Sequence, residues 1–166
     1  MFSPIENPRV VSAIIPSVNN SSQIGAYISL KNVNKAYIVV SAVLEATTAI
    51  TIYPYQATAV AGTGAKVFST DGNHNLNWWL CSAATSEDTL TKQTAAATNT
   101  FQFSSSTGKG KLMVIEVPTG MLDLANGFDC LSVRTAVGTT GDLISVQYYL
   151  NMRYAEGDAV SSVFGD

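Results

Sequence analysis

Charged side chains are scarce in this sequence of 166 residues, where Asp, Glu, Lys and Arg together make up 13%. Soluble globular proteins usually carry about 25%. Hydrophobic residues make up 46%, so the surface must be built largely from Ser, Thr, Asn, Gly and small apolar side chains. Such a surface packs against neighbours more readily than it repels them. The composition therefore favours a protein that assembles into something larger.

Long hydrophobic runs and an excess of basic charge are also missing. No segment approaches the roughly 18 to 20 uninterrupted apolar residues of a membrane-spanning helix, so we expect no membrane partner. The formal net charge is −3, whereas nucleic-acid binders usually carry a clustered basic face, so we expect no nucleic acid partner either. The first seven residues include Pro4 and Glu6 and lack the pattern of a signal peptide, which predicts synthesis in a cytoplasm.

Residue types that perform catalysis or bind metals are few. His74 is the only histidine, and it lies in a turn-like segment without the HxH or HExxH spacing of a metal site. The only adjacent carboxylates, Glu87 and Asp88, would point to opposite faces of a strand. Cys81 and Cys130 lie far apart without a CxxC pair, which predicts two buried thiols. We therefore expect no enzyme activity, metal, cofactor or small-molecule substrate.

The sequence does contain a succession of short runs rich in Val, Ile, Tyr, Phe and Thr, separated by Gly, Asn, Ser and Pro. This is the pattern of strands and turns. Two runs, 37–40 and 112–115, are continuously apolar, which is typical of strands covered on both sides by a second sheet or a neighbouring subunit. The predicted strands are Val10–Ile15, Ala26–Lys31, Lys35–Ala42, Ala49–Tyr55, Ala65–Phe68, Asn77–Cys81, Thr89–Gln93, Thr100–Phe103, Lys111–Val117, Phe128–Arg134 and Leu143–Tyr149.

About ten strands and little helix predict an all-β fold, a single-domain antiparallel β-sandwich or jelly roll. One helical turn is expected to close at Asn126 and Gly127, because glycine accepts the left-handed conformation at a helix end. The sandwich is expected to span 10–155. An N-terminal extension over 1–9 and a C-terminal tail over 156–166 are segments that an assembly could order.

Aromatic and arginine side chains supply the candidate interface, since both types are enriched where proteins meet. Of the neighbouring rings of Trp78 and Trp79, one should face the core and the other should face outward. The prolines of the N-terminal segment favour an extended strap across a neighbour. The candidate interface residues are Pro4, Pro8, Trp78, Trp79, Tyr148, Tyr149, Arg153 and Tyr154.

Four segments carry a resemblance to a known family: 26–32 (AYISLKN), 56–66 (QATAVAGTGAK), 125–130 (ANGFDC) and 153–155 (RYA). Together they resemble a family of small structural proteins encoded among the head genes of tailed bacteriophages and prophages, over roughly Val10 to Ala155. The resemblance implies a virion protein on the capsid surface, a decoration or cement protein. Its implied partners are the major capsid protein and further copies of itself, expected as a homotrimer. The chain departs from the family pattern around Ser69 to Trp79.

Two alternatives stay open beside the decoration protein. A tail or head-tail connector subunit would need the same β-rich, charge-poor surface. A receptor- or glycan-binding module is the other alternative, because β-sandwiches often carry such sites and Trp78, Trp79 and Tyr53 could stack on sugars.

Overall fold

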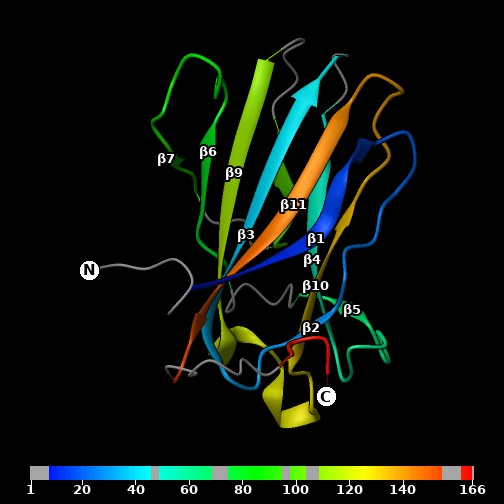
Figure 1. Cartoon of the computed structure of the whole chain (residues 1–166), viewed down its shortest axis with the longest axis vertical. Coiled ribbons are helices and arrows are strands. Elements are labelled where there is room, and N and C mark those ends of the chain that lie inside the picture. Colours follow the sequence, from blue (N-terminus) through cyan, green and yellow to red (C-terminus); the bar gives the residue numbers. More distant parts are fainter. Residues whose placement is uncertain are drawn as a thin grey trace.

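The computed structural model describes residues 8–45, 49–68, 75–94, 98–103, 109–154 and 162–165. Within them, eleven strands form two antiparallel sheets that pack face to face (Figure 1). The predicted all-β sandwich is confirmed. Two short 3₁₀ turns, Thr119–Met121 and Leu124–Asn126, are the helical elements of these ranges. No helix in the described residues is long and apolar enough to cross a membrane.

The larger sheet has six strands and lies at the front of Figure 1. In spatial order they are β1 (Pro8–Val18), β11 (Leu143–Met152), β3 (Val33–Leu44), β9 (Lys109–Pro118), β6 (Trp78–Cys81) and β7 (Thr91–Lys92). On β3, Ile38 and Val40 are fully buried whereas Val43 is exposed, because successive side chains of a strand point to opposite faces. One face of this sheet therefore builds the core, and the other is the outer surface of the molecule.

The first strand, β1, is the irregular edge of the six-stranded sheet. Its pairing with β11 runs from Pro8 opposite Asn151 to Val18 opposite Leu143, with register shifts after Ser12 and again after Ile14. Such bulges bend an edge strand and increase its twist. By contrast, β3 pairs with β9 over ten consecutive positions without a shift.

The smaller sheet has five strands and lies behind the larger one in Figure 1. Its strands are β2 (Ile28–Ser29), β10 (Cys130–Thr135), β4 (Thr51–Ala57), β5 (Lys66–Val67) and β8 (Phe101–Gln102), the last pairing with β4. The core lies between the sheets and includes Ile52 and Val133 from this sheet. Each fully buried side chain of this size stabilises the fold by about 1.5 to 3 kcal/mol.

A buried carboxylate ties together the loops at one end of the sandwich. Asp142, fully buried, accepts hydrogen bonds at Oδ1 from the backbone N–H of Glu45 (2.9 Å) and at Oδ2 from that of Thr139 (2.8 Å). Its backbone carbonyl accepts a third from the N–H of Asn19 (2.8 Å). Three loops that are distant in sequence are thereby held to one residue.

Each of the eleven predicted strands overlaps a strand of the structure, and the differences lie in their bounds. The clearest difference is β2, predicted over Ala26–Lys31 but paired only at Ile28–Ser29, because Ala26 donates its backbone N–H to the Ala13 carbonyl of β1 instead. Gly127 follows the second 3₁₀ turn with φ +79°, so the predicted left-handed end of a helical turn is confirmed. Val163, within the predicted C-terminal tail, is buried and its carbonyl accepts a hydrogen bond from the N–H of Ser29 (2.8 Å).

Candidate functional site

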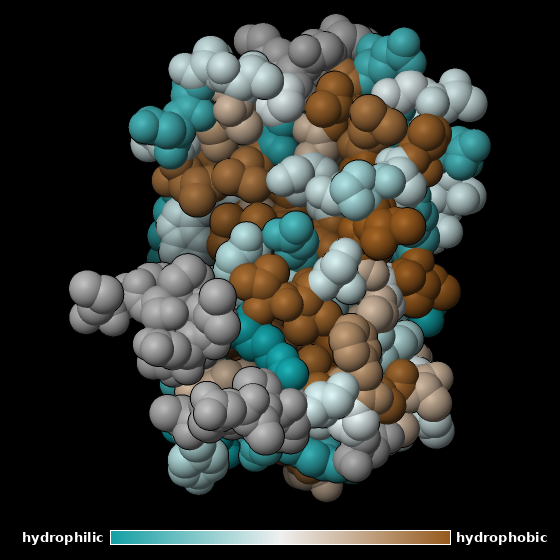
Figure 2. Space-filling model, in the orientation of Figure 1, coloured by the Kyte–Doolittle hydropathy of each residue, from teal (hydrophilic) through white to brown (hydrophobic). Residues whose placement is uncertain are grey.

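The outer face of the six-stranded sheet is largely apolar. Figure 2 shows this side of the molecule, with hydrophobic residues spread across its centre among a few polar ones. Several are well exposed, including Val10 (49%), Val43 (42%) and Leu143 (48%). We call this surface the apolar face and define it by the outward side chains of β1, β11, β3, β9 and β6: Val10, Tyr37, Val39, Val43, Trp79, Leu112, Val114, Leu143 and Tyr149.

The pairing of the strands aligns these side chains in rows across the sheet. Near one end, Val10 lies opposite Tyr149, which lies opposite Tyr37. Near the other end, Leu143 lies opposite Val43. Cross-strand neighbours on one face are about 4.5 to 5.5 Å apart at Cβ, so each row forms a continuous apolar strip.

The two charged side chains that β3 and β9 place on this face neutralise each other. Lys35 Nζ forms an ion pair with Glu116 Oε1, and this contact raises the pKa of Lys35 above its ordinary value. Asn77 Nδ2 donates a long hydrogen bond to Glu116 Oε2 (3.4 Å). The apolar face therefore presents no net charge from this pair to whatever covers it.

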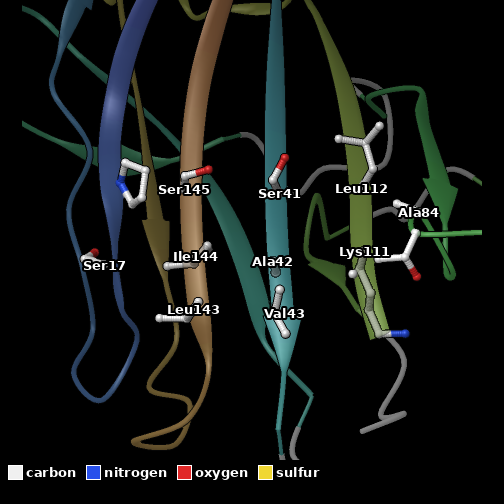
Figure 3. A pocket seen from close by; sticks show the side chains of 13 residues that line it. Ser17, Ser41, Ala42, Val43, Ala84, Lys111, Leu112, Leu143, Ile144 and Ser145 are labelled. Carbon is white, nitrogen blue, oxygen red and sulfur yellow. The ribbon is translucent and has the colours of Figure 1, made fainter. Parts of the chain in front are cut away.

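A groove of about 480 Å³ crosses the apolar face at the Val43 end (Figure 3). It runs over the ends of β1, β11, β3 and β9. Many of its lining side chains are small, among them Ser41, Ser145, Ala84 and Gly110. These small residues form the floor of the groove, and larger apolar side chains such as Val43 form its walls.

A second groove, of about 550 Å³, lies beside Trp79. It is lined by Tyr37, Trp79, Leu90, Val114 and Glu116. Lys92 Nζ lies 5.9 Å from the centre of the Trp79 ring, within the range of a cation–π contact. Bulky aromatic side chains therefore gather on this part of the apolar face, in contrast to the small residues of the first groove.

The outer face of the five-stranded sheet has a different chemistry, dominated by tyrosine and arginine. Arg134 lies opposite Tyr53 in the β10–β4 pair, and its guanidinium carbon lies 4.0 Å from the centre of the Tyr55 ring. Arg134 Nη2 donates to the Tyr27 hydroxyl (3.3 Å), which is the main reason that the pKa of Arg134 is raised. We call this surface the Tyr–Arg face and define it by Ile24, Tyr27, Tyr53, Tyr55, Val67 and Arg134.

A glycine holds Tyr27 in place on the Tyr–Arg face. Gly62, with φ +78°, brings its backbone so close that an added Cβ would lie 2.9 Å from Tyr27 Cε2. Glycine is the residue that adopts this φ without steric cost. The turn therefore packs against the ring that Arg134 contacts, and the Tyr–Arg cluster is fixed from two sides.

The tryptophan pair divides as predicted. The ring of Trp78 packs edge-on against Phe101, with centroids 5.5 Å apart and planes at 68°, and its Nε1 donates to the Thr94 carbonyl (3.0 Å). Trp79 lies opposite Val114, a residue of the apolar face. One ring thus faces the core and the other faces outward.

The prediction that Tyr148 contributes to an interface is wrong. Its side chain is fully buried between the sheets, and its hydroxyl donates to the Ala26 carbonyl (3.2 Å). Burial raises the pKa of the phenol above its ordinary value. The cause is strand alternation, since Val146 and Leu150 on the same side of β11 are also in the core, whereas Tyr149 is 37% exposed on the apolar face.

The remaining candidate interface residues lie at the end of β11 or at the N-terminus. Arg153 is exposed, and its Nε donates to the Val33 carbonyl (3.2 Å). Tyr154 is 70% exposed. The backbone of Pro8 begins β1, and Pro4 lies outside the described residues. The structure does not join these residues to Trp79 in one cluster.

The two cysteines and the single histidine belong to the residue types that perform catalysis or bind metals. Cys81 and Cys130 are both buried thiols, as predicted, and they donate to the Glu87 carbonyl (3.5 Å) and to Asp129 Oδ1 (3.3 Å). His74 lies outside the described residues. Among those that are described, no group of three or more His, Cys, Asp or Glu is placed to hold a metal ion.

The sequence interpretation left out most residues of the two faces, although part of the pattern was visible. The runs 37–40 and 112–115 are apolar at every position, but only alternate side chains enter the core. The others, including Val39 and Val114, form the apolar face. The Tyr–Arg face was not foreseen, because it joins Tyr27 to Arg134 across 107 positions of sequence.

No protein-family model matches the chain, and no curated protein matches its sequence. Among solved structures, the chain is similar to the SPBc2 prophage-derived protein YomS, at 8% identity and a TM-score of 0.44, over 86% of this chain and 93% of that one. It is also similar to a structure described as "CBM4 structure and function", at 10% identity and a TM-score of 0.34, over 87% and 70%. TM-scores below 0.5 do not establish a common fold, so neither neighbour's role is transferred to this chain.

Proposed function

We propose that the chain is a structural protein of a bacteriophage virion, a decoration protein that binds the shell built by the major capsid protein. One observation of the structure carries the proposal: both outer faces of the sandwich have the composition of protein interfaces. The apolar face is exposed and nearly uncharged, and the Tyr–Arg face gathers two of the residue types enriched at interface hot spots. A subunit with two opposite contact surfaces can link neighbours on both sides.

The resemblance of four sequence segments to head-associated phage proteins supports the choice of a virion as the assembly. The mechanism of a decoration protein is mass action. Whatever binds the assembled shell and not its separated subunits raises the free energy needed to open it, by about 2.7 kcal/mol per site at a free concentration one hundred times the Kd. The chain needs no catalytic group for this role.

We assign the shell contact to the Tyr–Arg face. Arg134 is held by Tyr27 and Tyr55, so little side-chain entropy is lost when a partner binds it. Tyrosine rings add a large contact area at low conformational cost. This is the preorganisation expected of a surface that binds a fixed partner.

The first test is quantitative mass spectrometry of purified virions, which compares the copy number of this chain with that of the major capsid protein. A ratio near one that falls after mild dissociation, while the shells stay intact, supports the decoration role. A few copies to a few dozen per particle refutes it and favours a tail or connector subunit. Absence from the particle refutes every virion role.

A binding assay then tests the Tyr–Arg face. Stripped particles are incubated with purified wild type, with Arg134→Glu, or with Lys31→Glu as a control that reverses an exposed charge elsewhere. We expect Arg134→Glu to lose at least tenfold in affinity and Lys31→Glu to bind like wild type. Equal binding by all three proteins would remove this face from the proposal.

One observation favours a second candidate, a glycan-binding module. Tyr37, Trp79 and Glu116 line one groove, and aromatic rings with a nearby carboxylate provide stacking surface and hydrogen-bond acceptors. The predicted trio is not formed, because Trp78 faces the core and Tyr53 lies on the opposite sheet. Glycan-array binding that is lost in Trp79→Ala, together with absence from virions, would establish this candidate in place of the first.

A further inference from the structure

The apolar face exposes hydrophobic side chains on a chain with few charges, so electrostatic repulsion between neighbouring molecules is weak. A partner that covers this face must itself be apolar where the two surfaces meet. We propose that two copies of this chain pack face to face through their apolar faces. A two-fold axis relates them. It lies in the interface between the six-stranded sheets of the two copies, perpendicular to the strands and level with Val40. The pairing is a property of the chain itself. It goes beyond the proposed virion role and does not depend on a shell.

The size of the apolar face fits such a pair. Strands β1, β11, β3 and β9 contribute about ten residues each. At roughly 3.4 Å per residue and 4.8 Å between strands, they span on the order of 650 Å² in projection, and the side chains add further accessible area. A stable interface buries about 800 Å² per partner. Two sandwiches packed on these faces therefore reach the size of a standard interface.

The charge of the face also fits a second copy. A surface meets its own copy without repulsion when its charges cancel locally. On the apolar face, Lys35 and Glu116 already form an ion pair, and the rows on either side of the centre are built from apolar, Ser and Gln side chains. Two copies thus bring together neutral surfaces over β11, β3 and β9, and Lys92 of β7, beside Trp79, adds one positive charge at the edge of the face.

The shape of the face is complementary to itself. Its tyrosines, Tyr37 and Tyr149, share a row toward one end, and the groove with the small residues Ser41 and Ser145 lies toward the other. Bulky residues at one end and a low floor at the other are what a two-fold contact requires, because it places each end of one copy over the opposite end of the second.

The strand register specifies which residues meet. Tyr37 and Val43 lie at equal distances in sequence on either side of Val40, and the same rows hold Tyr149 and Leu143 on β11. The axis above Val40 therefore places Tyr37 of one copy over Val43 of the other, and Tyr149 over Leu143. The two aromatic rings then pack against Val43 and Leu143, which line the groove.

The edges of the described sheets offer a poorer contact than the face. The edge strand β1 is interrupted by register shifts and contains Pro16, and proline cannot donate to a strand ladder. The opposite edge strand, β7, and the edge strands β2 and β5 have two residues each. Pairing through backbone ladders would therefore be short, and packing through side chains of the face is favoured.

The mass of the full-length protein in solution tests the pairing. Sedimentation velocity or light scattering at on the order of 100 µM should give twice the chain mass of 17.6 kDa, because interfaces of this size have Kd values from micromolar to picomolar. Leu143→Glu should give 17.6 kDa with an unchanged circular dichroism spectrum. Leu124→Glu is the matched control, since Leu124 is 47% exposed and Leu143 is 48% exposed, and it should remain a dimer.

A charge-swap pair tests the register and does not depend on one variant. Leu143→Lys and Tyr149→Glu should each be monomeric alone, and an equimolar mixture should recover the dimer mass because the lysine of one chain meets the glutamate of the other. A monomeric wild type, a trimer, a dimer that Leu143→Glu leaves intact, or a mixture that stays monomeric would each overturn the proposal. A dimer that fails to bind virions would leave the pairing intact and refute only the proposed function.

Discussion

The two neighbouring tyrosines of β11 provide a sharp test of the structure, because strand alternation gives them opposite surroundings. Tyr148 is fully buried and Tyr149 is 37% exposed. Replacing each in turn by alanine removes the same atoms from adjacent positions of one strand. The difference between the two variants therefore measures burial together with the hydrogen bond that the buried hydroxyl makes.

Tyr148→Ala should lower the free energy of unfolding by about 4 to 6 kcal/mol. Removal of a large buried ring costs roughly 3 to 5 kcal/mol through lost transfer energy and the cavity left behind. The hydrogen bond from its hydroxyl to the Ala26 carbonyl adds about 1 kcal/mol. Domains have a total stability of about 5 to 15 kcal/mol, so this variant loses a large part of it or fails to fold. Tyr149→Ala should cost less than about 1 kcal/mol, as surface substitutions usually do.

Urea unfolding followed by the fluorescence of Trp78 and Trp79 measures both values. Both substitutions are made in the Leu143→Glu background, so that dimer formation does not contribute to the stability. A cost for Tyr148→Ala below about 1 kcal/mol, or equal costs for the two variants, would refute the placement of β11 and with it the assignment of the apolar face.

Three further predictions concern single groups. Burial raises the pKa of Tyr148 above its unfolded value near 10. The contribution of this phenol to stability is therefore constant below pH 10 and is lost as the pH rises further, by up to about 1.4 kcal/mol per pH unit. Tyr148→Phe should remove this part of the pH dependence in unfolding experiments at alkaline pH. Gly62→Ala should cost more than Gly127→Ala in the same urea assay, because both glycines have φ near +79° but only Gly62 touches Tyr27, and equal losses would contradict that contact. Asp142→Asn should cost about 1 to 3 kcal/mol by turning a donor toward one of two backbone N–H groups, and a melting temperature equal to wild type would argue against the buried carboxylate.

Much of the fold could be predicted from local sequence because strands and turns are local patterns. Apolar runs bounded by turn residues identified all eleven strands, and the Gly127 turn followed from the φ that glycine accepts. The alternation of side chains along β11 also predicts that Tyr148 is buried, because Ile144, Val146 and Leu150 lie on the same side of the strand and are all apolar. The general enrichment of tyrosine at interfaces was the weaker guide there.

The candidate site could be predicted only in part because it depends on strand order. The apolar face exists because β11 lies between β1 and β3, and β3 lies beside β9. Hydrophobic periodicity says which side chains of a strand are apolar but not which strands are neighbours. The contact of Tyr27 with Arg134 likewise joins segments that are distant in sequence, and no local pattern encodes it.

The position of β11 has a consequence for the synthesis of the chain. As the last strand of the sheet to leave the ribosome, β11 supplies the pairing partner of β1 and one of the two neighbours of β3. Pairing β11 with β1 closes a loop over most of the chain, and the entropy lost in closing it must be overcome before the pairing stabilises the sheet. Such non-local pairing makes folding slow. The complete six-stranded sheet therefore forms only after translation has passed residue 152, and a nascent chain that stops short of β11 lacks the strand that joins β1 to β3.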